Sequence, residues 1–464
     1  MSIYRLRTCE GLLGEFKELE RQTIFLAASD KFNDPLEDFV YLEYKGDKIL
    51  WDNMFKEFVV AMEHKMYLAP LYNSDDYNNN GEFDTFMDGN IHGPKVGPYF
   101  EHKDYPDRIN SILDRFFGYA CVSKWSDYLS NRDTHINNEQ LIAILNMLSH
   151  LAAESILHAY EQLPNKKQFY ADFINYFDGL INEIESHNTK LLSAITDSDN
   201  EDVVLNTMYL DFQTRMTLHY STSDLNAKGV SNYYFWFDLP TKFVDELKDF
   251  VYYRWYAAAF MKNQPIRMDL WGNYAKDHTG VCLIFKDAKE LMVKGIKHLQ
   301  SGHVEYNNEI ITFDFFKRMW VLCGNVLYKD WYSDRHGNVS PLLNEALTRT
   351  EDELKEFWAS VEKIKYRKNT DWESETEFRF TVDDNWINVS DPKFRSLVYH
   401  FNSLEGIVFG VRTTVLNKAM IYKIISDKCK EHSRNDFKFY QARYDKLKGV
   451  LVYDELINIG KHTN

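Results

Sequence analysis

Hydrophobic and polar residues alternate in short runs near both ends of the chain, a pattern typical of half-buried strands. Between these runs, apolar residues recur three and four positions apart, as on one face of a helix. The pattern predicts strands at residues 3–8, 23–27, 280–285, 302–306, 370–380, 406–410 and 437–444. It predicts helices at 12–20, 51–67, 288–299, 313–326, 342–364 and 416–432.

The middle of the chain has helical spacing almost throughout. Asn138 suits the N-cap of a helix whose apolar stripe continues to Ile156. The sequence therefore predicts an α+β fold in three parts. The first is an α/β core domain made of residues 1–70 and 255–464. The second is a long polar loop at 71–108, and the third is an α-helical insertion at 109–254.

The stretch Thr370–Phe380 combines acidic and aromatic residues in an unusual way. A strand there would carry one charged and one aromatic face, with Glu373, Glu375, Glu377 and Arg379 on the first and Trp372, Phe378 and Phe380 on the second. Adjacent like charges cost free energy unless a cation, a ligand or water offsets them. A solvated face of an edge strand is the commoner explanation of this pattern, and a functional site is the other.

The composition is that of a globular protein with a large core. Of the 464 residues, 44% are hydrophobic and 16% aromatic. The net charge of −16 argues against a general affinity for polyanions. Five widely spaced cysteines without a CxxC pair indicate free thiols. Because no secretory signal and no apolar run of about 18 residues is apparent, we expect a cytoplasmic protein without a membrane span.

The common catalytic motifs are missing from the sequence. It contains no glycine-rich phosphate loop, GxSxG elbow or HExxH pair. His150, Glu154 and His158 follow one another at intervals of four, which places three potential metal ligands on one helix face. Intrahelical hydrogen bonds explain this spacing more often, so we predict no metal site.

Four sequence boxes in a fixed order carry a family resemblance. They are Tyr4-Arg5-Leu6-Arg7 with Phe25–Ser29, Phe32-Asn33-Asp34-Pro35 with Glu37, Trp271–Ala275 with His278–Phe285, and Trp372-x-x-Glu375-x-Glu377-x-Arg379. The order resembles a bacterial family known as domain of unknown function 2971. The likeness covers roughly residues 1–60 and 255–450 and leaves the helical insertion unexplained.

The same boxes are remotely similar to ADP-ribosyltransferase-type folds. That resemblance implies small antiparallel sheets that form a cleft, with NAD as the substrate bound there. It implies that Glu377 is the catalytic carboxylate, that Glu375 acts on the acceptor, and that Tyr274 stacks on or positions the substrate. The residues it implies for NAD binding are Arg5, Arg7, Ser29 and Arg379.

We therefore predict an enzyme that transfers ADP-ribose from NAD to a macromolecular acceptor, protein or nucleic acid, or that hydrolyses NAD. The resemblance suggests a bacterial toxin or phage-defence effector. Two alternatives stay open: a metal-dependent nuclease, and a non-enzymatic sensor whose helical insertion binds a partner protein. The nuclease would gather Mg²⁺ with four carboxylates, those of Asp34, Glu37, Glu375 and Glu377.

Overall fold

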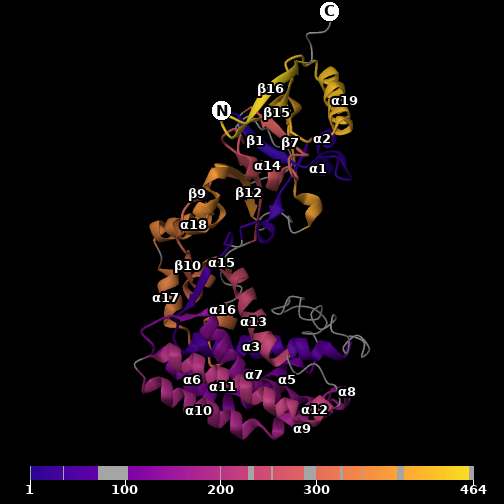
Figure 1. Cartoon of the computed structure of the whole chain (residues 1–464). Coiled ribbons are helices and arrows are strands. Elements are labelled where there is room, and N and C mark those ends of the chain that lie inside the picture. Colours follow the sequence, from indigo (N-terminus) through magenta and orange to yellow (C-terminus); the bar gives the residue numbers. More distant parts are fainter. Residues whose placement is uncertain are drawn as a thin grey trace, which may run out of the picture. The chain divides into compact units, whose positions relative to one another are not determined.

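The chain folds into two compact units in the computed structural model (Figure 1). We call them the sheet unit, which comprises Met1–Phe39, Tyr253–Ile311 and Lys355–Asn464, and the helical unit, which comprises Val40–Tyr252 and Thr312–Leu354. The structure describes residues 2–34, 36–71, 103–198, 200–227, 235–251, 254–286, 299–323, 328–348, 350–383 and 391–458. The chain contains both strands and helices, largely in separate stretches, which confirms the predicted α+β class.

The helical unit is built from antiparallel helices and one small three-stranded sheet, in the order β10-β4-β5. Its described helices are α3 (Lys48–Leu68), α5 (Tyr105–Gly118), α6 (Ala120–Ser130), α7 (Asn138–Tyr160), α8 (Pro164–Phe169), α9 (Ala171–Asp178), α10 (Ile181–Thr196), α11 (Glu201–Ser221), α12 (Asp224–Ala227), α13 (Phe235–Leu247), α15 (Phe315–Cys323), α16 (Tyr328–Trp331) and α17 (Pro341–Leu347). The strands are β4 (Tyr41–Tyr44), β5 (Ile136–Asn137) and β10 (Thr312–Asp314), and α18 (Glu351–Lys365) begins in this unit and ends in the other.

Helix α7 is the central helix of this unit and packs against α3, α5, α9, α10, α11 and α13 (Figure 1). Its N-cap is Asn137 rather than the predicted Asn138, because Asn137 and Gln140 form a reciprocal capping box. Among the described helices, only α7 is long and apolar enough to cross a membrane. However, 89% of its apolar stretch is buried, as expected for the core helix of a soluble protein.

The two units divide the chain differently from the predicted core, loop and insertion. Residues 40–70 belong to the helical unit, because the apolar side chains of α3 pack against α6 and α7. Residues 312–354 also belong to this unit. Of the predicted polar loop, residues 72–102 lie outside the described residues, and its last part is helical because α5 already begins at Tyr105.

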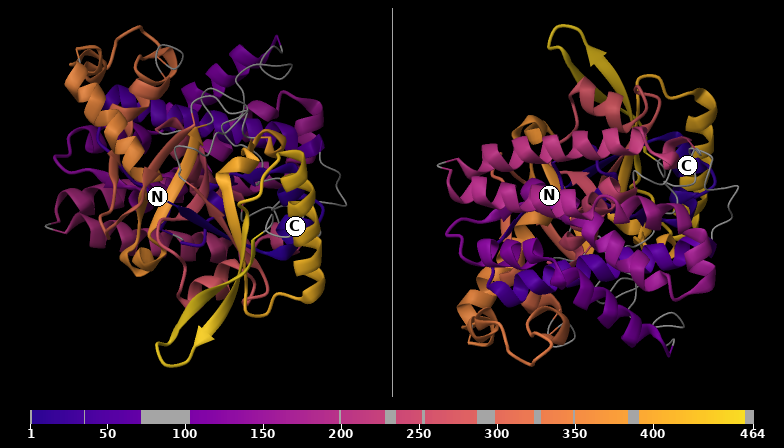
Figure 2. Two further views of the ribbon diagram at one scale, coloured as in Figure 1. Left: turned by 90° about the horizontal axis from the view of Figure 1, so that it is seen from above. Right: turned by 90° about the horizontal axis from the view of Figure 1, so that it is seen from below.

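The sheet unit contains a nine-stranded sheet in the order β16-β15-β14-β7-β1-β6-β12-β8, with β3 also pairing β6. Its strands are β1 (Ile3–Arg7), β3 (Ala27–Ala28), β6 (Trp255–Met261), β7 (Val281–Phe285), β8 (Gln300–His303), β12 (Glu377–Asp383), β14 (Leu404–Phe409), β15 (Lys438–Asp445) and β16 (Val450–Asn458). All of these pairings are antiparallel except that of β14 with β15. The β15–β16 hairpin, yellow in Figure 2, continues well beyond the four residues that β15 pairs with β14.

Short elements surround this sheet. Two small sheets pair β2 (Thr23–Phe25) with β13 (Ser396–Val398) and β9 (Glu305–Tyr306) with β11 (Arg367–Lys368). The helices are α1 (Cys9–Leu13), α2 (Glu18–Arg21), α14 (Met268–Tyr274) and α19 (Val415–Glu431), with the 3₁₀ turns η1 (Ser29–Lys31), η6 (Thr370–Glu375), η7 (Pro392–Phe394) and η8 (Phe401–Ser403). The predicted helix at 12–20 is therefore two short helices, and most of the one predicted at 288–299 lies outside the described residues.

The predicted strand through Thr370–Phe380 is only half correct. Residues up to Glu375 form the 3₁₀ turn η6, and Thr376 then adopts a left-handed conformation with φ of 45°. Strand β12 starts at Glu377 and lies between β6 and β8. The interpretation as a solvated edge strand is wrong, because β12 has a partner on each side and Glu375, Glu377 and Arg379 are all buried.

Strands β1 and β6 separate after a single residue pair. Strand β1 pairs with β7 along its whole length, but with β6 only at Tyr4 and Met261. On the same side of β6, β3 takes over pairing at Tyr256 and Ala257. The edge of β6 between these two partners faces an opening in the sheet, and this opening positions the candidate site.

Gly280 holds the end of β1 close to the start of β7. A Cβ atom at Gly280 would lie 2.2 Å from the backbone oxygen of Arg7, a contact that only a backbone shift can relieve. We predict that Gly280→Ala lowers the free energy of unfolding by about 1–3 kcal/mol, the usual cost of overpacking, as measured by urea denaturation.

Gly272 provides the matched control, because it lies inside α14 and a Cβ there would meet nothing within 4 Å. Gly272→Ala should stabilise the protein by roughly 0.5–1 kcal/mol through helix propensity. Equal effects of the two substitutions would show that Gly280 is not a close-contact position.

Candidate functional site

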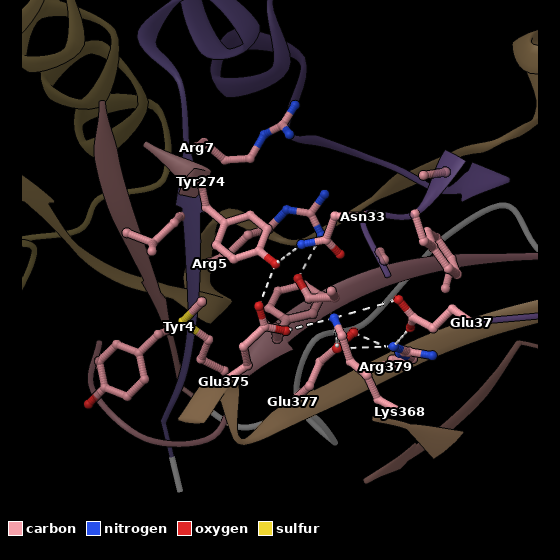
Figure 3. A pocket seen from close by; sticks show the side chains of 18 of the residues that line it. Tyr4, Arg5, Arg7, Asn33, Glu37, Tyr274, Lys368, Glu375, Glu377 and Arg379 are labelled. Carbon is pink, nitrogen blue, oxygen red and sulfur yellow. Dashed lines mark hydrogen bonds and ion pairs between the residues drawn. The ribbon is translucent and has the colours of Figure 1, made fainter. Parts of the chain in front are cut away.

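A pocket of about 390 Å³ opens in the sheet unit where β1 and β6 separate (Figure 3). Residues Arg5, Leu6 and Arg7 of β1 line one side, and residues 257–261 of β6 line the other. Its charged lining residues are Arg5, Arg7, Lys31, Lys368 and Arg379 against Glu37, Glu375 and Glu377. The pocket thus joins charged residues of both signs from the first forty positions with charged residues of both signs from position 368 onward.

Glu375 and Glu377 both line the pocket because Thr376, the residue between them, adopts a left-handed backbone conformation. Glu375 is the last residue of η6, and Thr376 turns the chain into β12, where Glu377 is the first residue. Both carboxylates are buried, and the backbone N–H of Glu377 donates to the Tyr306 hydroxyl at 2.7 Å. Glu373, in the same 3₁₀ turn, is exposed and does not line the pocket.

Two buried cations hold the carboxylates of the pocket together (Figure 3). The ammonium of Lys368 lies 2.8 Å from Glu375, 3.4 Å from Glu377 and 3.6 Å from Glu37. The guanidinium of Arg379 bonds Glu377 through Nε at 2.6 Å and also bonds Glu37. We call these five residues the charge cluster. Three carboxylates and two cations leave it one negative charge in excess when all are ionised.

Burial and charge shift the ionisation of the cluster in opposite directions. Burial, only partly offset by Lys368, raises the pKa of Glu377 from its ordinary 4.5 to about 7. Burial disfavours the charge on Lys368, but Glu377 and Glu375 outweigh it and raise the pKa of this lysine. Near neutral pH the lysine is therefore charged, while Glu377 can gain or lose a proton. A carboxyl poised in this way is a recurrent feature of catalytic sites.

Tyr274 closes one side of the pocket above Glu375 (Figure 3). It is the last residue of α14, and its hydroxyl donates to Glu375 and accepts a hydrogen bond from Asn33. Burial, and then Glu375, raises the pKa of Tyr274 above its usual range, so the phenol keeps its proton. Tyr274 is thus a neutral hydrogen-bond donor directed at Glu375.

Arg5 and Arg7 both line the pocket but differ in their partners. Arg7 forms an ion pair with Glu18, its Nε lying 2.9 Å from the carboxylate. Arg5 is buried and donates to two backbone carbonyls, those of Ala259 and Phe25, at 3.2 and 3.4 Å. Within the described part of the chain Arg5 has no carboxylate partner. Burial, and then Arg7, lowers the pKa of Arg5 to about 9, so this guanidinium remains charged near neutral pH.

The structure brings most of the predicted site residues together. Tyr274, Glu375, Glu377, Arg5, Arg7 and Arg379 all line the pocket. Ser29 does not: it is buried at the start of η1, outside the pocket lining. Arg379 lines the pocket, and its guanidinium bonds Glu37 and Glu377.

Sequence reasoning missed Lys368 as a site residue and gave Asn33 no role in the site. The box around Phe32 gave some signal, since residues 32–37 form part of the family resemblance and contribute Phe32, Asn33 and Glu37 to the pocket. Asp34 of this box accepts a hydrogen bond from the backbone N–H of Asn369 and so ties the box to η6. No local pattern indicated Lys368, because one of its acidic partners, Glu37, is distant in the chain, and the other two, Glu375 and Glu377, lie at and just beyond the end of the turn η6.

The side chains that the sequence offers as possible metal ligands form no ion site among the described residues. No group of three or more His, Cys, Asp or Glu side chains in the described ranges is placed to hold a metal ion. Of the four carboxylates in the nuclease hypothesis, three surround the ammonium of Lys368. In the helical unit, Glu154 pairs with Arg115 and Tyr119, and the His150 ring packs against Phe177 and Phe212.

The family comparison covers the later half of the site. Residues 270–380 match the family model described as "Protein of unknown function (DUF2971)", which confirms the predicted resemblance over this segment. The segment contains Tyr274, Lys368 and the two carboxylates Glu375 and Glu377, whereas β1 and the Phe32 box lie before it. Comparison with curated proteins and with solved structures gives no match for this chain.

The raised pKa of Glu377 predicts a pH dependence of stability. A carboxyl with a higher pKa in the folded than in the unfolded state binds more protons when folded. The free energy of unfolding should therefore fall as the pH rises from about 4.5 to about 7, by up to roughly 3 kcal/mol. Glu377→Gln should lack this component in urea denaturation at pH 5, 6, 7 and 8. A variant with the same pH slope as the native protein would contradict the raised pKa.

Proposed function

We propose that the protein binds NAD in this pocket and breaks the bond between nicotinamide and ribose, transferring ADP-ribose to a macromolecular acceptor or to water. The observation that carries the proposal is the meeting of Arg5 with Glu377 and Tyr274 in one pocket between separated strands. The remote likeness to ADP-ribosyltransferase-type folds implies a cleft between small antiparallel sheets, and we propose that the opening between β1 and β6 of the nine-stranded sheet serves as the NAD site instead.

Arg5 is the best-suited anchor for the pyrophosphate. A buried guanidinium without a carboxylate partner is costly, and a phosphate in the pocket would satisfy it with charge-assisted hydrogen bonds. Its present acceptors are the carbonyls of Ala259 and Phe25. Arg7 is less suitable, because Glu18 already neutralises it.

Glu377 is proposed to act on the ribose. As a carboxylate it accepts a hydrogen bond from the ribose 2′-hydroxyl and stabilises the positive charge that develops at C1′ as the bond to nicotinamide breaks. The electron pair of that bond leaves with nicotinamide, which departs neutral. The excess negative charge of the charge cluster favours the same transition state.

Glu375 and Tyr274 are proposed to act on the acceptor side. The incoming nucleophile forms a bond to C1′ and loses its proton, for which the proposed base is Glu375, the other carboxylate beside Thr376 in the pocket. The Tyr274 hydroxyl fixes the Glu375 carboxylate through its hydrogen bond. The acceptor is a protein or a nucleic acid, and we propose that the helical unit recognises a partner protein. A role as a bacterial toxin or phage-defence effector fits this chemistry.

Glu377→Gln tests the reaction itself. We predict that it lowers nicotinamide release from NAD by about a hundredfold to a thousandfold, the order expected when a group that stabilises transition-state charge is lost. Circular dichroism should show an unchanged fold. The control is Glu373→Gln, a neighbouring but exposed carboxylate outside the pocket, which should keep native turnover. Full activity of Glu377→Gln protein would refute its catalytic role.

Arg5→Met and Arg7→Met separate the two candidate anchors. Loss of a charged hydrogen bond costs about 1.5–3 kcal/mol, so Arg5→Met should raise the KM for NAD by about tenfold or more. Arg7→Met should raise it less, because Arg7 is already paired with Glu18. Steady-state kinetics of nicotinamide release measures both, and a larger effect of Arg7→Met would reverse the assignment.

A further inference from the structure

Lys368 occupies the point where three buried carboxylates meet. It is the second residue of β11, and its side chain is only 3% exposed, so water contributes little to neutralising its neighbours. Its ammonium contacts Glu375, Glu377 and Glu37. Arg379 bonds Glu377 and Glu37, but within the described residues no bond joins it to Glu375. Lys368 is therefore the cation that the two carboxylates on either side of Thr376 share.

The two carboxylates could not both stay ionised without such a cation. Two buried carboxylates that face one site repel each other, and one of them then takes up a proton at neutral pH. Burial and Glu375 both act to raise the pKa of Glu377, and Lys368 is the main group that opposes them. A protonated Glu377 would lose the charge that a developing cation requires.

We propose that Lys368 is a positioning residue of this site, whose ammonium holds the Glu375 and Glu377 carboxylates side by side and favours the ionised form of the pair. This role rests on the proposed function. It adds to that function the cation that keeps the carboxylate pair available for the reaction with NAD. The charged and titratable groups that face the pair are Lys368 from β11, Arg379 from β12, Glu37 from the turn after η1, Tyr306 from β9 and Tyr274 from α14.

The chain offers a closely matched control in Lys365. Its side chain is 2% exposed, and its ammonium lies 2.7 Å from Asp383 and 2.9 Å from Glu362. Like Lys368, it is a buried lysine of the sheet unit that contacts more than one carboxylate, but it does not line the pocket. Lys365→Met should therefore destabilise the fold to a similar degree without affecting the pocket carboxylates.

The test compares Lys368→Met, Lys368→Arg and Lys365→Met by two readouts. The first is the pH profile of kcat/KM for nicotinamide release. In Lys368→Met we expect the acidic limb of this profile to shift to higher pH by at least one unit. At pH values below the limb, kcat/KM should therefore fall at least tenfold. Lys368→Arg keeps the cation and should keep the limb near its native position, as should Lys365→Met.

The second readout is the infrared band of protonated carboxyl groups across the same pH range, assigned by its loss in Glu377→Gln. This readout does not require turnover. In Lys368→Met the band should persist to a pH at least one unit higher than in the native protein. If the wild type releases no nicotinamide at any pH, the proposed function fails, and the infrared titration alone decides whether Lys368 controls the pair. A native titration in folded Lys368→Met protein overturns the inference. Should that variant not fold, Lys368→Gln, which keeps a hydrogen-bond donor without the charge, takes its place with the same expected shift.

Discussion

Three carboxylates and two cations share the buried floor of the pocket, and each of them depends on the others to remain charged there. Removing one partner of a buried ion pair typically costs about 3–5 kcal/mol, because the other charge is left without compensation. Glu37 comes from the turn after η1, Lys368 from β11, Glu375 from η6, and Glu377 with Arg379 from β12. The charge cluster thus ties an early turn to three later elements, and its geometry depends on all four.

The opening between β1 and β6 makes this cluster reachable by a ligand. A sheet edge without a neighbouring strand leaves backbone groups that need other partners. Arg5 supplies one by donating to the carbonyl of Ala259, in the stretch where β6 has lost β1 and has not yet gained β3. The same side chain lines the pocket, so one residue both completes the sheet edge and presents a positive charge to the pocket.

Local periodicity in the sequence was enough to locate several elements and part of the site. The alternation near residue 3 predicted β1, and the apolar run near residue 281 predicted β7, because the strand period is a property of neighbouring residues. The period failed at Thr376, whose left-handed conformation removes Glu373 from the face that holds Glu377. Nothing in an alternating pattern signals such a residue.

Contacts between distant parts of the chain were beyond this kind of prediction. The pairing of Arg379 with Glu37 joins residues 342 positions apart, and no local pattern indicated that Arg7 pairs with Glu18. The boundary between the two units could not be predicted for a similar reason. The sequence places α3 in the core domain, and only its contacts with α7 assign it to the helical unit. Family resemblance, by contrast, pointed to the Phe32 box and to Tyr274 without any knowledge of their contacts.

The central claim is that NAD occupies the opening between β1 and β6, with its phosphates at Arg5 and its nicotinamide ribose at Glu377. A crystal structure of the Glu377→Gln variant grown with NAD tests this directly, since the dinucleotide should remain intact. Density for NAD between the two strands, with phosphate oxygens within hydrogen-bond distance of Arg5, is the predicted result. NAD bound elsewhere, or a pocket that stays empty at millimolar NAD, would contradict it.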